Sequence, residues 1–244
     1  MIRLGVTGTD TGVGKTTVSR ALLGLMRADG LRVAAMKPVE TGVAVDDPAS
    51  DACALAAAAG NGASMRDVCP IVLAEPLAPW MAARRAGRPL AMNPLDESFH
   101  RLIRDVDAIL VEGAGGLLVP ITESDTYLAL FQRWSLDAIV VAANRLGVIS
   151  HTRLTVDRLR DGGVRILGVV LNETDGAAPD LARRTNHEAL RTLLPDTPVV
   201  SFPWLPSHAD DSSVARAAAA SGLGGLIAHS APERHHIEEG RAHR

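Results

Sequence analysis

A glycine-rich segment near the N-terminus constrains the possible fold more than any other feature of this chain. Residues 8–16 read GTDTGVGKT, follow a short apolar run at residues 2–7, and precede a segment with apolar residues at helical spacing. Such a turn between a strand and a helix is the usual context of a phosphate-binding loop, because its backbone N–H groups and the helix N-terminus converge on phosphate oxygens. Five residues lie between Gly8 and Gly14, one more than in the common pattern.

Two side chains at the end of this loop predict more specific chemistry. Lys15 is placed to neutralise phosphate charge, and the Thr16 hydroxyl is placed to bind Mg²⁺. A glycine-rich turn that binds nothing is the alternative. The sequence GKTT at the start of the expected helix favours phosphate binding over that alternative.

The rest of the chain alternates apolar runs of strand type with segments of helical periodicity. We expect strands at residues 2–7, 31–36, 108–111, 138–143, 166–171 and 199–202, and helices at residues 51–59, 95–104 and 150–161, with a first helix from Thr16 to a terminating Gly30. Near-continuous apolar strands between helices are typical of a parallel sheet covered on both faces. The sequence therefore predicts a single-domain α/β fold of the P-loop NTPase type, in which the loops at the carboxyl ends of the strands share one edge.

No internal repeat and no linker divides the chain. We therefore expect one domain over residues 1–228, followed by a polar tail at residues 229–244. The tail is rich in histidine, but a flexible terminus is favoured over a metal site there.

Lysine is scarce in this sequence. Of 25 basic residues 23 are arginines, and the two lysines are Lys15 and Lys37. Lys37 begins the sequence KPVETG after the second expected strand, and the following proline favours extended backbone at the lysine. We expect Lys37 on the ligand edge of the sheet, one strand away from the phosphate-binding loop, with Thr41 near enough to orient a substrate group. A solvated surface lysine is the alternative.

Two acidic residues are candidates for a metal site. Glu112 follows the buried strand at 108–111 and opens a glycine run, and Asp51 follows Ser50 at the start of a helix. Carboxylates at the ligand edge are suited to Mg²⁺, as phosphoryl transfer requires. Helix capping is the alternative explanation for both residues.

Composition excludes several classes of function. A formal net charge of −3 and a sequence pI of about 6.2 give no basic excess of the kind that nucleic-acid binding usually shows. No apolar run reaches the roughly 20 residues that span a bilayer, and the N-terminus lacks the regions of a signal peptide. Cys53 and Cys69 are too few for a disulfide framework. We expect a cytoplasmic protein that binds neither nucleic acid nor membrane.

Eight segments of the chain together resemble the dethiobiotin synthetases, the ATP-dependent ligases of biotin synthesis. They read TGTDTGVGKT, KPVETG, SDA, EPLAP, VEGAGGLLVP, NRLGVISHTRLT, GVVLNE and PWLP, and they span nearly the whole sequence. The five-residue spacing in the phosphate-binding loop is the spacing that this family uses. The resemblance implies a Mg²⁺-dependent cyclo-ligase that forms C–N bonds, converting 7,8-diaminopelargonate, CO₂ (or bicarbonate) and ATP into dethiobiotin, ADP and phosphate.

The resemblance also implies a nucleotide site. Lys15 and Lys37 match catalytic lysines, and Thr16, Asp51 and Glu112 would surround Mg²⁺. Asn172 and Glu173 match an adenine-recognising pair, and residues 203–205 match the loop that closes over the base. The complete implied nucleotide site is Gly12, Val13, Gly14, Lys15, Thr16, Thr17, Asp51, Glu112, Gly113, Ala114, Gly115, Asn172, Glu173, Pro203, Trp204, Leu205 and Asp210.

A substrate site is implied as well. Thr41 stands where the family has a serine or threonine that touches the substrate, and Thr11 is assigned to the same site. In the family, a segment matching residues 146–151 binds the substrate carboxylate across a homodimer interface, and the residues implied here are Gly147, Val148 and Ser150. The sequence departs from some members at Gly12, where they have glutamate, and at Ser150, where others have asparagine.

The implied reaction passes through a carbamate and a carbamic–phosphoric anhydride, and needs no side-chain nucleophile. Two other classes of protein share such a sheet. One is the nucleotide-switch ATPase of the partitioning or division-site type, but Asp10 stands where those proteins have a signature lysine. The other is an amide-forming ligase with a glutaminase domain, for which no residues remain in this chain.

Overall fold

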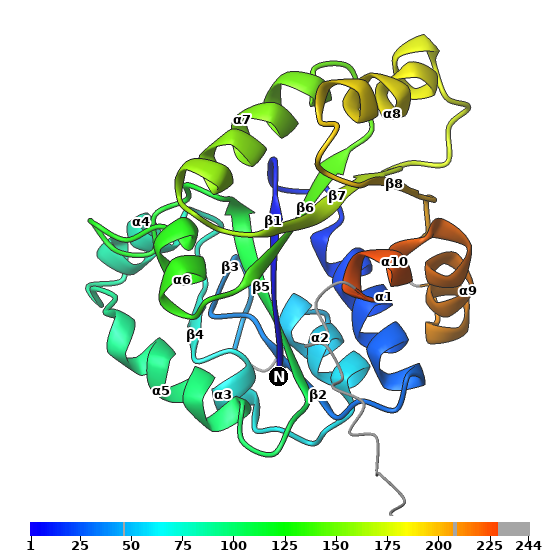
Figure 1. Ribbon diagram of the computed structural model, residues 1–244. Coiled ribbons are helices and arrows are strands. Elements are labelled where there is room, and N and C mark those ends of the chain that lie inside the picture. The colour runs from blue at the N-terminus through cyan, green and yellow to red at the C-terminus, as the bar shows by residue number, and fades with distance from the viewer. Residues whose placement is uncertain (46, 207–208, 229–244) are drawn as a thin grey trace, which may run out of the picture.

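The computed structural model describes residues 1–45, 47–206 and 209–228, and within them a six-stranded parallel sheet forms the centre (Figure 1). Its strands lie in the order β2-β5-β1-β6-β7-β8. The strands are β1 (Ile2–Gly8), β2 (Val33–Met36), β5 (Ala108–Gly116), β6 (Asp137–Ala143), β7 (Ile166–Asn172) and β8 (Val199–Phe202). Every neighbouring pair is parallel, so the carboxyl ends of all six strands meet at one edge.

Helices cover both faces of this sheet (Figure 1). One face is covered by α1 (Lys15–Ala28), α2 (Asp51–Ala59), α9 (Asp211–Ser221) and α10 (Leu223–Ala228). The other face is covered by α5 (Met92–Leu102), α6 (Tyr127–Arg133), α7 (Val148–Asp161) and α8 (Leu181–Leu193). The predicted α/β fold with helices on both faces is therefore confirmed.

Each strand buries alternate side chains in two hydrophobic cores. In β5, Leu110 joins the core beneath α1, while Ile109 and Val111 join the core on the opposite face. Burial on both faces explains why the strands are apolar without alternation. Gly5 in β1 lies directly against the ring of Phe131, where an added Cβ would stand 2.5 Å from a ring carbon. A larger residue at this position would push α6 away from the sheet.

A small second sheet is the main feature that the sequence analysis did not predict. β3 (Val39–Thr41) and β4 (Ile71–Leu73) pair in parallel, and α4 (Pro79–Arg85) packs against both strands. α3 (Met65–Val68) precedes β4 and lies against α2, α5 and β2. These strands and helices of three to seven residues are too short to show a hydrophobic periodicity, so the sequence does not predict them. The sheet places Thr41 at the end of a strand.

Several predicted boundaries also differ from the structure. β5 continues to Gly116 instead of ending at residue 111, and α5 and α7 each begin two or three residues earlier than expected. The first helix ends as predicted, with Gly30 in a left-handed conformation just beyond it. α6, α8, α9 and α10 were not predicted. α8 carries many polar and charged residues and contributes few side chains to the core.

The predicted tail at residues 229–244 lies outside the described residues, so the domain boundary at 228 stays a prediction. None of the helices in the described part of the chain combines the length and the apolar character needed to cross a membrane.

Candidate active site

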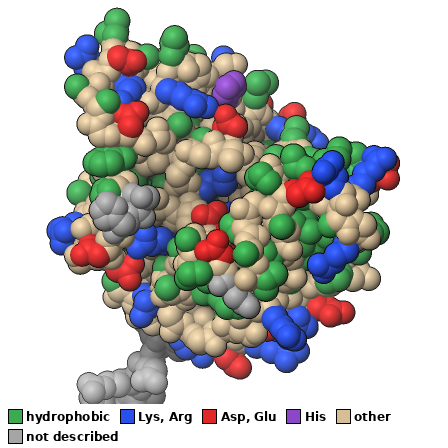
Figure 2. Space-filling model, turned by 180° about the vertical axis from the view of Figure 1, so that it is seen from behind, with side chains coloured by type: hydrophobic (Ala, Val, Ile, Leu, Met, Phe, Trp, Pro, Cys, Tyr) green, Lys and Arg blue, Asp and Glu red, His purple; other side chains and the backbone are tan. Residues whose placement is uncertain are grey.

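A cavity of about 800 Å³ opens at the carboxyl ends of β1, β2 and β5. Figure 2 shows a hollow on one face of the molecule, with basic and acidic side chains inside it and hydrophobic side chains around its rim. The cavity is lined by Thr11, Gly12, Gly14, Lys15, Thr16, Lys37, Glu40, Thr41, Val43, Ala49, Asp51, Pro76, Leu77, Ala78, Pro79, Ala114, Gly115 and Val119. It therefore brings together the phosphate-binding loop and the KPVETG segment, which the sequence separates by about 20 residues.

The phosphate-binding loop takes its shape from glycine at position 14. Gly14 has a left-handed backbone (φ 87°) and precedes the first residue of α1. An added Cβ would lie 2.1 Å from the side-chain amide nitrogen of Asn172, which donates a hydrogen bond to the Val13 carbonyl (2.9 Å). Only glycine satisfies both the backbone conformation and this close approach. Asn172 thus ties the end of β7 to the loop.

Lys15 lies at the floor of the cavity and is 7% exposed. Its ammonium donates to the Asp10 carbonyl at 3.2 Å, so the side chain folds back over its own loop. Burial lowers the pKa of Lys15, and the nearby Lys37 ammonium lowers it further, while carboxylates in the cavity act in the opposite direction.

Glu112 stands at the centre of the site and is completely buried. One carboxylate oxygen accepts hydrogen bonds from the Thr16 hydroxyl (2.9 Å) and the Lys37 ammonium (2.6 Å), and the other accepts from the Ser19 hydroxyl (2.7 Å). Glu112 lies within β5 instead of at a helix start, so capping does not explain it. Ser19 was missed by the sequence analysis because nothing in its neighbourhood distinguishes it from other residues of α1.

Lys37 directly follows β2 and is 3% exposed, so it is not a surface lysine. Its ammonium donates to Asp51 (2.7 Å) as well as to Glu112 (2.6 Å). Burial alone would lower the pKa of Lys37, but the two carboxylates outweigh burial and raise it above its ordinary value. The side chain therefore carries a positive charge at neutral pH.

Asp51 is the first residue of α2, and the helix is capped by other groups. Ser50 is the N-cap and its hydroxyl accepts from the Cys53 amide (3.2 Å). Glu40 accepts from the amides of Asp51 (2.7 Å) and Ala52 (3.0 Å). The Asp51 carboxylate is thus free to face the cavity. Burial opposes its ionisation, but the Lys37 ammonium holds the pKa of Asp51 below its usual value.

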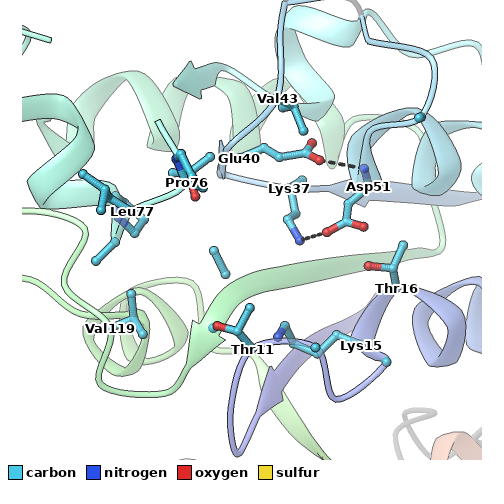
Figure 3. A pocket seen from close by; sticks show the side chains of 18 residues that line it. Thr11, Lys15, Thr16, Lys37, Glu40, Val43, Asp51, Pro76, Leu77 and Val119 are labelled. Carbon is cyan, nitrogen blue, oxygen red and sulfur yellow. Dashed lines mark hydrogen bonds and ion pairs between the residues drawn. The ribbon is translucent and has the colours of Figure 1, made fainter. Parts of the chain in front are cut away.

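Thr16, Asp51 and Glu112, the predicted metal ligands, are linked through hydrogen bonds: Glu112 accepts from Thr16 and Lys37, and Lys37 also donates to Asp51. Figure 3 shows Thr16, Lys37 and Asp51 close together. Among the described residues there is no cluster of three or more His, Cys, Asp and Glu side chains arranged to hold a metal. Two carboxylates and a hydroxyl are hard oxygen donors, and Mg²⁺ takes its remaining ligands from water and phosphate oxygens. The donor set therefore fits Mg²⁺ accompanied by a nucleotide.

Glu173 does not face this cavity. Its carboxylate accepts from Asn144 (2.5 Å) and from Arg183, whose Nε lies 2.8 Å away. Asn144 in turn accepts from the amide of Asn186 (2.9 Å). This network ties the ends of β6 and β7 to α8.

The predicted base-closing residues lie beyond the end of β8. Trp204 is 44% exposed, and its ring carbons come within 3.1 Å of where a Cβ on Gly176 would stand. The two loops after β7 and β8 therefore pack against each other there. Asp210 is the N-cap of α9 and accepts from the Ser213 amide (2.8 Å). Capping accounts for Asp210, and its role at a nucleotide remains a prediction.

The predicted substrate residues fall into two groups. Thr11 and Thr41 line the cavity. Gly147, Val148 and Ser150 lie elsewhere, at the start of α7, where Gly147 is a left-handed N-cap (φ 92°). Val148 is buried and Ser150 is exposed.

One wall of the cavity is apolar, which the sequence analysis missed. It is formed by Pro76, Leu77 and Val119, which lie across the cavity from Lys37 and Asp51 (Figure 3). Val43 and Pro79 also line the cavity. A molecule with a charged end and an aliphatic end matches both walls. The apolar residues come from loops and short elements that have no periodic pattern.

Comparison with known proteins adds independent information. The family model described as an AAA domain matches residues 3–212. The ATP-dependent dethiobiotin synthetase BioD of Anaeromyxobacter sp. (strain Fw109-5) is 43% identical over 198 residues, covering 78% of this chain and 88% of the relative. The protein of the same name from Aquifex aeolicus (strain VF5) is 36% identical over 79% of this chain and 84% of the relative.

Solved structures with the same fold are more distant. The Pyrococcus furiosus cell division ATPase MinD superimposes with a TM-score of 0.52 at 20% identity and covers 95% of this chain and 100% of its own. The pNOB8 ParA protein bound to nonspecific DNA gives a TM-score of 0.55 at 12% identity, over 94% of this chain and 98% of its own. At these identities the likeness supports the fold alone.

Proposed function

The chain belongs to the family of ATP-dependent dethiobiotin synthetases, which are ligases of biotin biosynthesis, and from this premise we propose that it closes the ureido ring of dethiobiotin in the cytoplasm. The substrates would be 7,8-diaminopelargonate, CO₂ and ATP. The observation that carries the proposal is the position of Lys37. Its ammonium lies in the same cavity as the phosphate-binding loop, between two carboxylates and opposite an apolar wall.

The proposed reaction has three steps. One amine of diaminopelargonate adds to CO₂ and loses a proton, which gives a carbamate. A carbamate oxygen attacks the γ-phosphorus of ATP and displaces ADP, which gives a carbamic–phosphoric anhydride. The second amine then attacks the carbonyl carbon, expels phosphate and loses a proton, and the five-membered ring is closed.

The residues of the cavity supply charge and position for these steps. Lys15 and the backbone N–H groups of residues 12–17 bind the phosphates, and Lys37 stabilises negative charge on the carbamate and on the phosphoryl group being transferred. Thr16, Asp51 and Glu112 would hold Mg²⁺, which supplies further positive charge at the phosphates when it is bound. The remaining contribution is the alignment of carbamate and phosphate in a site that excludes water.

Diaminopelargonate and the nucleotide occupy different parts of the site. The apolar wall holds the alkyl chain of diaminopelargonate, and Thr11 and Thr41 orient its reacting end. Residues 113–115 border the nucleotide, and Asn172 and Glu173 with residues 203–205 recognise the base. In support of this division, Asn172 joins the base region to the phosphate-binding loop through the Val13 carbonyl.

An assay of ADP release tests the proposal directly. We expect release to require both diaminopelargonate and bicarbonate, with dethiobiotin identified by mass spectrometry. ATP hydrolysis that proceeds equally without diaminopelargonate would instead favour a nucleotide-switch ATPase, which the shared fold with MinD and ParA proteins would accommodate.

Replacement of Glu112 by glutamine tests the metal site. The amide keeps the shape of the side chain and an oxygen for Lys37 (2.6 Å), so the fold is expected to persist. We expect the Mg²⁺ concentration for half-maximal activity to rise about tenfold or more, since a charged ligand is lost. Mg²⁺ titrations of the parent and the variant give the answer. Curves that overlay would mean that Glu112 is not a metal ligand.

We also propose a homodimer in which α7 meets its copy and completes the substrate site. Leu146 and Leu154 are 83% and 67% exposed on either side of Ser150, and Leu181 is 71% exposed on the adjoining α8. Two exposed leucines flanking Ser150, with a third on the helix that packs against α7, are typical of an interface.

The exposed leucine at position 154 provides a test of this dimer. Leu154→Glu is expected to convert the protein to a monomer in light-scattering measurements and to raise the KM for diaminopelargonate, because two carboxylates would face each other without partners. Binding of ADP should not change. A parent protein that is already monomeric at micromolar concentration would contradict the proposed dimer.

A further inference from the structure

Glu40 has a buried carboxylate in the wall of the cavity. The proposed reaction assigns no role to this residue. It is the middle residue of β3 and is 5% exposed. One of its oxygens accepts from the Asp51 amide (2.7 Å) and the other from the Ala52 amide (3.0 Å). A carboxylate is costly to bury unless its oxygens are hydrogen-bonded, and these two contacts satisfy both of them.

The two amides belong to the first turn of α2. The first N–H groups of a helix have no partners within it. Ser50 accepts from the amide of Cys53, and Glu40 accepts from the two amides before it. A residue of a neighbouring strand therefore completes the cap of this helix, and its negative charge is favourable at the helix N-terminus.

The contact joins the two segments that carry the charged groups of the site. Glu40 lies three residues after Lys37, and the backbone that it holds is that of Asp51, whose carboxylate pairs with Lys37 at 2.7 Å. Figure 3 shows both contacts side by side: Lys37 reaches the Asp51 side chain and Glu40 reaches the Asp51 backbone. Asp51 is thus held at two points.

We propose that Glu40 is a positioning residue that fixes the Asp51 carboxylate at the metal site. This inference rests on the proposed function, in which Asp51 binds Mg²⁺ and Lys37 acts on the reacting oxygens. When Lys37 engages those oxygens, its ion pair with Asp51 no longer suffices to hold the carboxylate. The hydrogen bonds from the Asp51 and Ala52 amides to Glu40 do not depend on Lys37. They therefore keep Asp51 in place during the reaction.

The test uses Mn²⁺ as a probe for the metal and measures its binding to the ADP complex by electron paramagnetic resonance. Glu40→Gln loses the charge and one of the two acceptor oxygens, and we expect the Mn²⁺ dissociation constant to rise about tenfold. Binding of ADP without metal should stay within about twofold of the parent, on the scale where 1.4 kcal/mol is tenfold. Glu97→Gln, at an exposed position of α5, is the matched control and should change neither quantity.

Two further variants separate positioning from general stability. Asp51→Asn should itself weaken Mn²⁺ binding, and Glu40→Gln added to it should cause no further loss, because Glu40 acts through Asp51. Glu40→Asp keeps the charge with a shorter side chain, so it should fold and show a smaller rise in the Mn²⁺ dissociation constant.

Three results would overturn the proposal. The first is unchanged Mn²⁺ binding in both Glu40 variants, and the second is an additional full loss when Glu40→Gln is combined with Asp51→Asn. The third is unchanged Mn²⁺ binding in Asp51→Asn, which removes the metal role of Asp51. None of these depends on whether the parent makes dethiobiotin, so the ADP-release assay reports a failure of the proposed function separately.

Discussion

Replacement of Lys37 by arginine is expected to abolish dethiobiotin formation almost as completely as replacement by alanine. The Lys37 ammonium fits between Asp51 and Glu112 at 2.7 and 2.6 Å, and both Lys37 and Glu112 are buried. A guanidinium is planar and larger than an ammonium, so it cannot take this position without moving one of the carboxylates. We expect a loss of at least about 10²-fold in kcat, equivalent to roughly 3 kcal/mol.

The two Lys37 variants should differ in stability. Lys37→Ala leaves the buried Glu112 carboxylate without its cation, and breaking such a pair costs about 3–5 kcal/mol. Adding Mg²⁺ and ATP should reverse part of the decrease in the melting temperature of Lys37→Ala. The metal ion would replace the lost positive charge between the same carboxylates. Arg88→Lys, a substitution at an exposed position, is the control and should change neither the activity nor the melting temperature. A Lys37→Arg enzyme within about threefold of the parent activity would show that this position accepts any cation.

Replacement of Lys15 by alanine is expected to lower the rate by about 10²–10⁴-fold. Lys15 lies at the floor of the phosphate-binding loop with its ammonium 3.2 Å from the Asp10 carbonyl, within reach of phosphate oxygens that enter the cavity. Its charge would follow the γ-phosphoryl group into the transition state, where negative charge is redistributed.

Single-turnover measurements with saturating ATP separate this role from nucleotide binding. The expected result is a slow chemical step with little change in the affinity for ADP, whose charge is also neutralised by Mg²⁺. More than a tenth of the parent activity in Lys15→Ala would remove the lysine from the mechanism.

The phosphate-binding loop and the two lysines were predictable because each carries a local signal. Glycines of fixed spacing between an apolar run and a helix define the loop, and Lys15 follows directly. Lys37 was distinguished by the scarcity of lysine and by its place after a strand. In the structure, Lys15 and Lys37 line the same cavity.

Other residues of the site gave no such signal. Ser19 contributes one hydroxyl from the buried side of α1, and Glu40 lies in a three-residue strand of the second sheet. Their importance depends on which distant backbone or carboxylate they meet in three dimensions, and no periodicity in the sequence reports such contacts. Asn172 was implied by the resemblance, but its contact with the Val13 carbonyl, which spans 159 positions, was not predicted.

The order of the strands sets the length of the active site. β5 lies between β1, which leads into the phosphate-binding loop, and β2, which leads into Lys37. Neighbouring strands are about 4.8 Å apart, so the two segments stand about 10 Å apart at the sheet edge. The backbone hydrogen bonds of the sheet fix this spacing between the two segments. Loop insertions and side-chain rotations therefore do not change it. Evolution of the cavity can therefore alter its depth and its walls, whereas the spacing between the backbone segments that carry Lys15 and Lys37 stays constant.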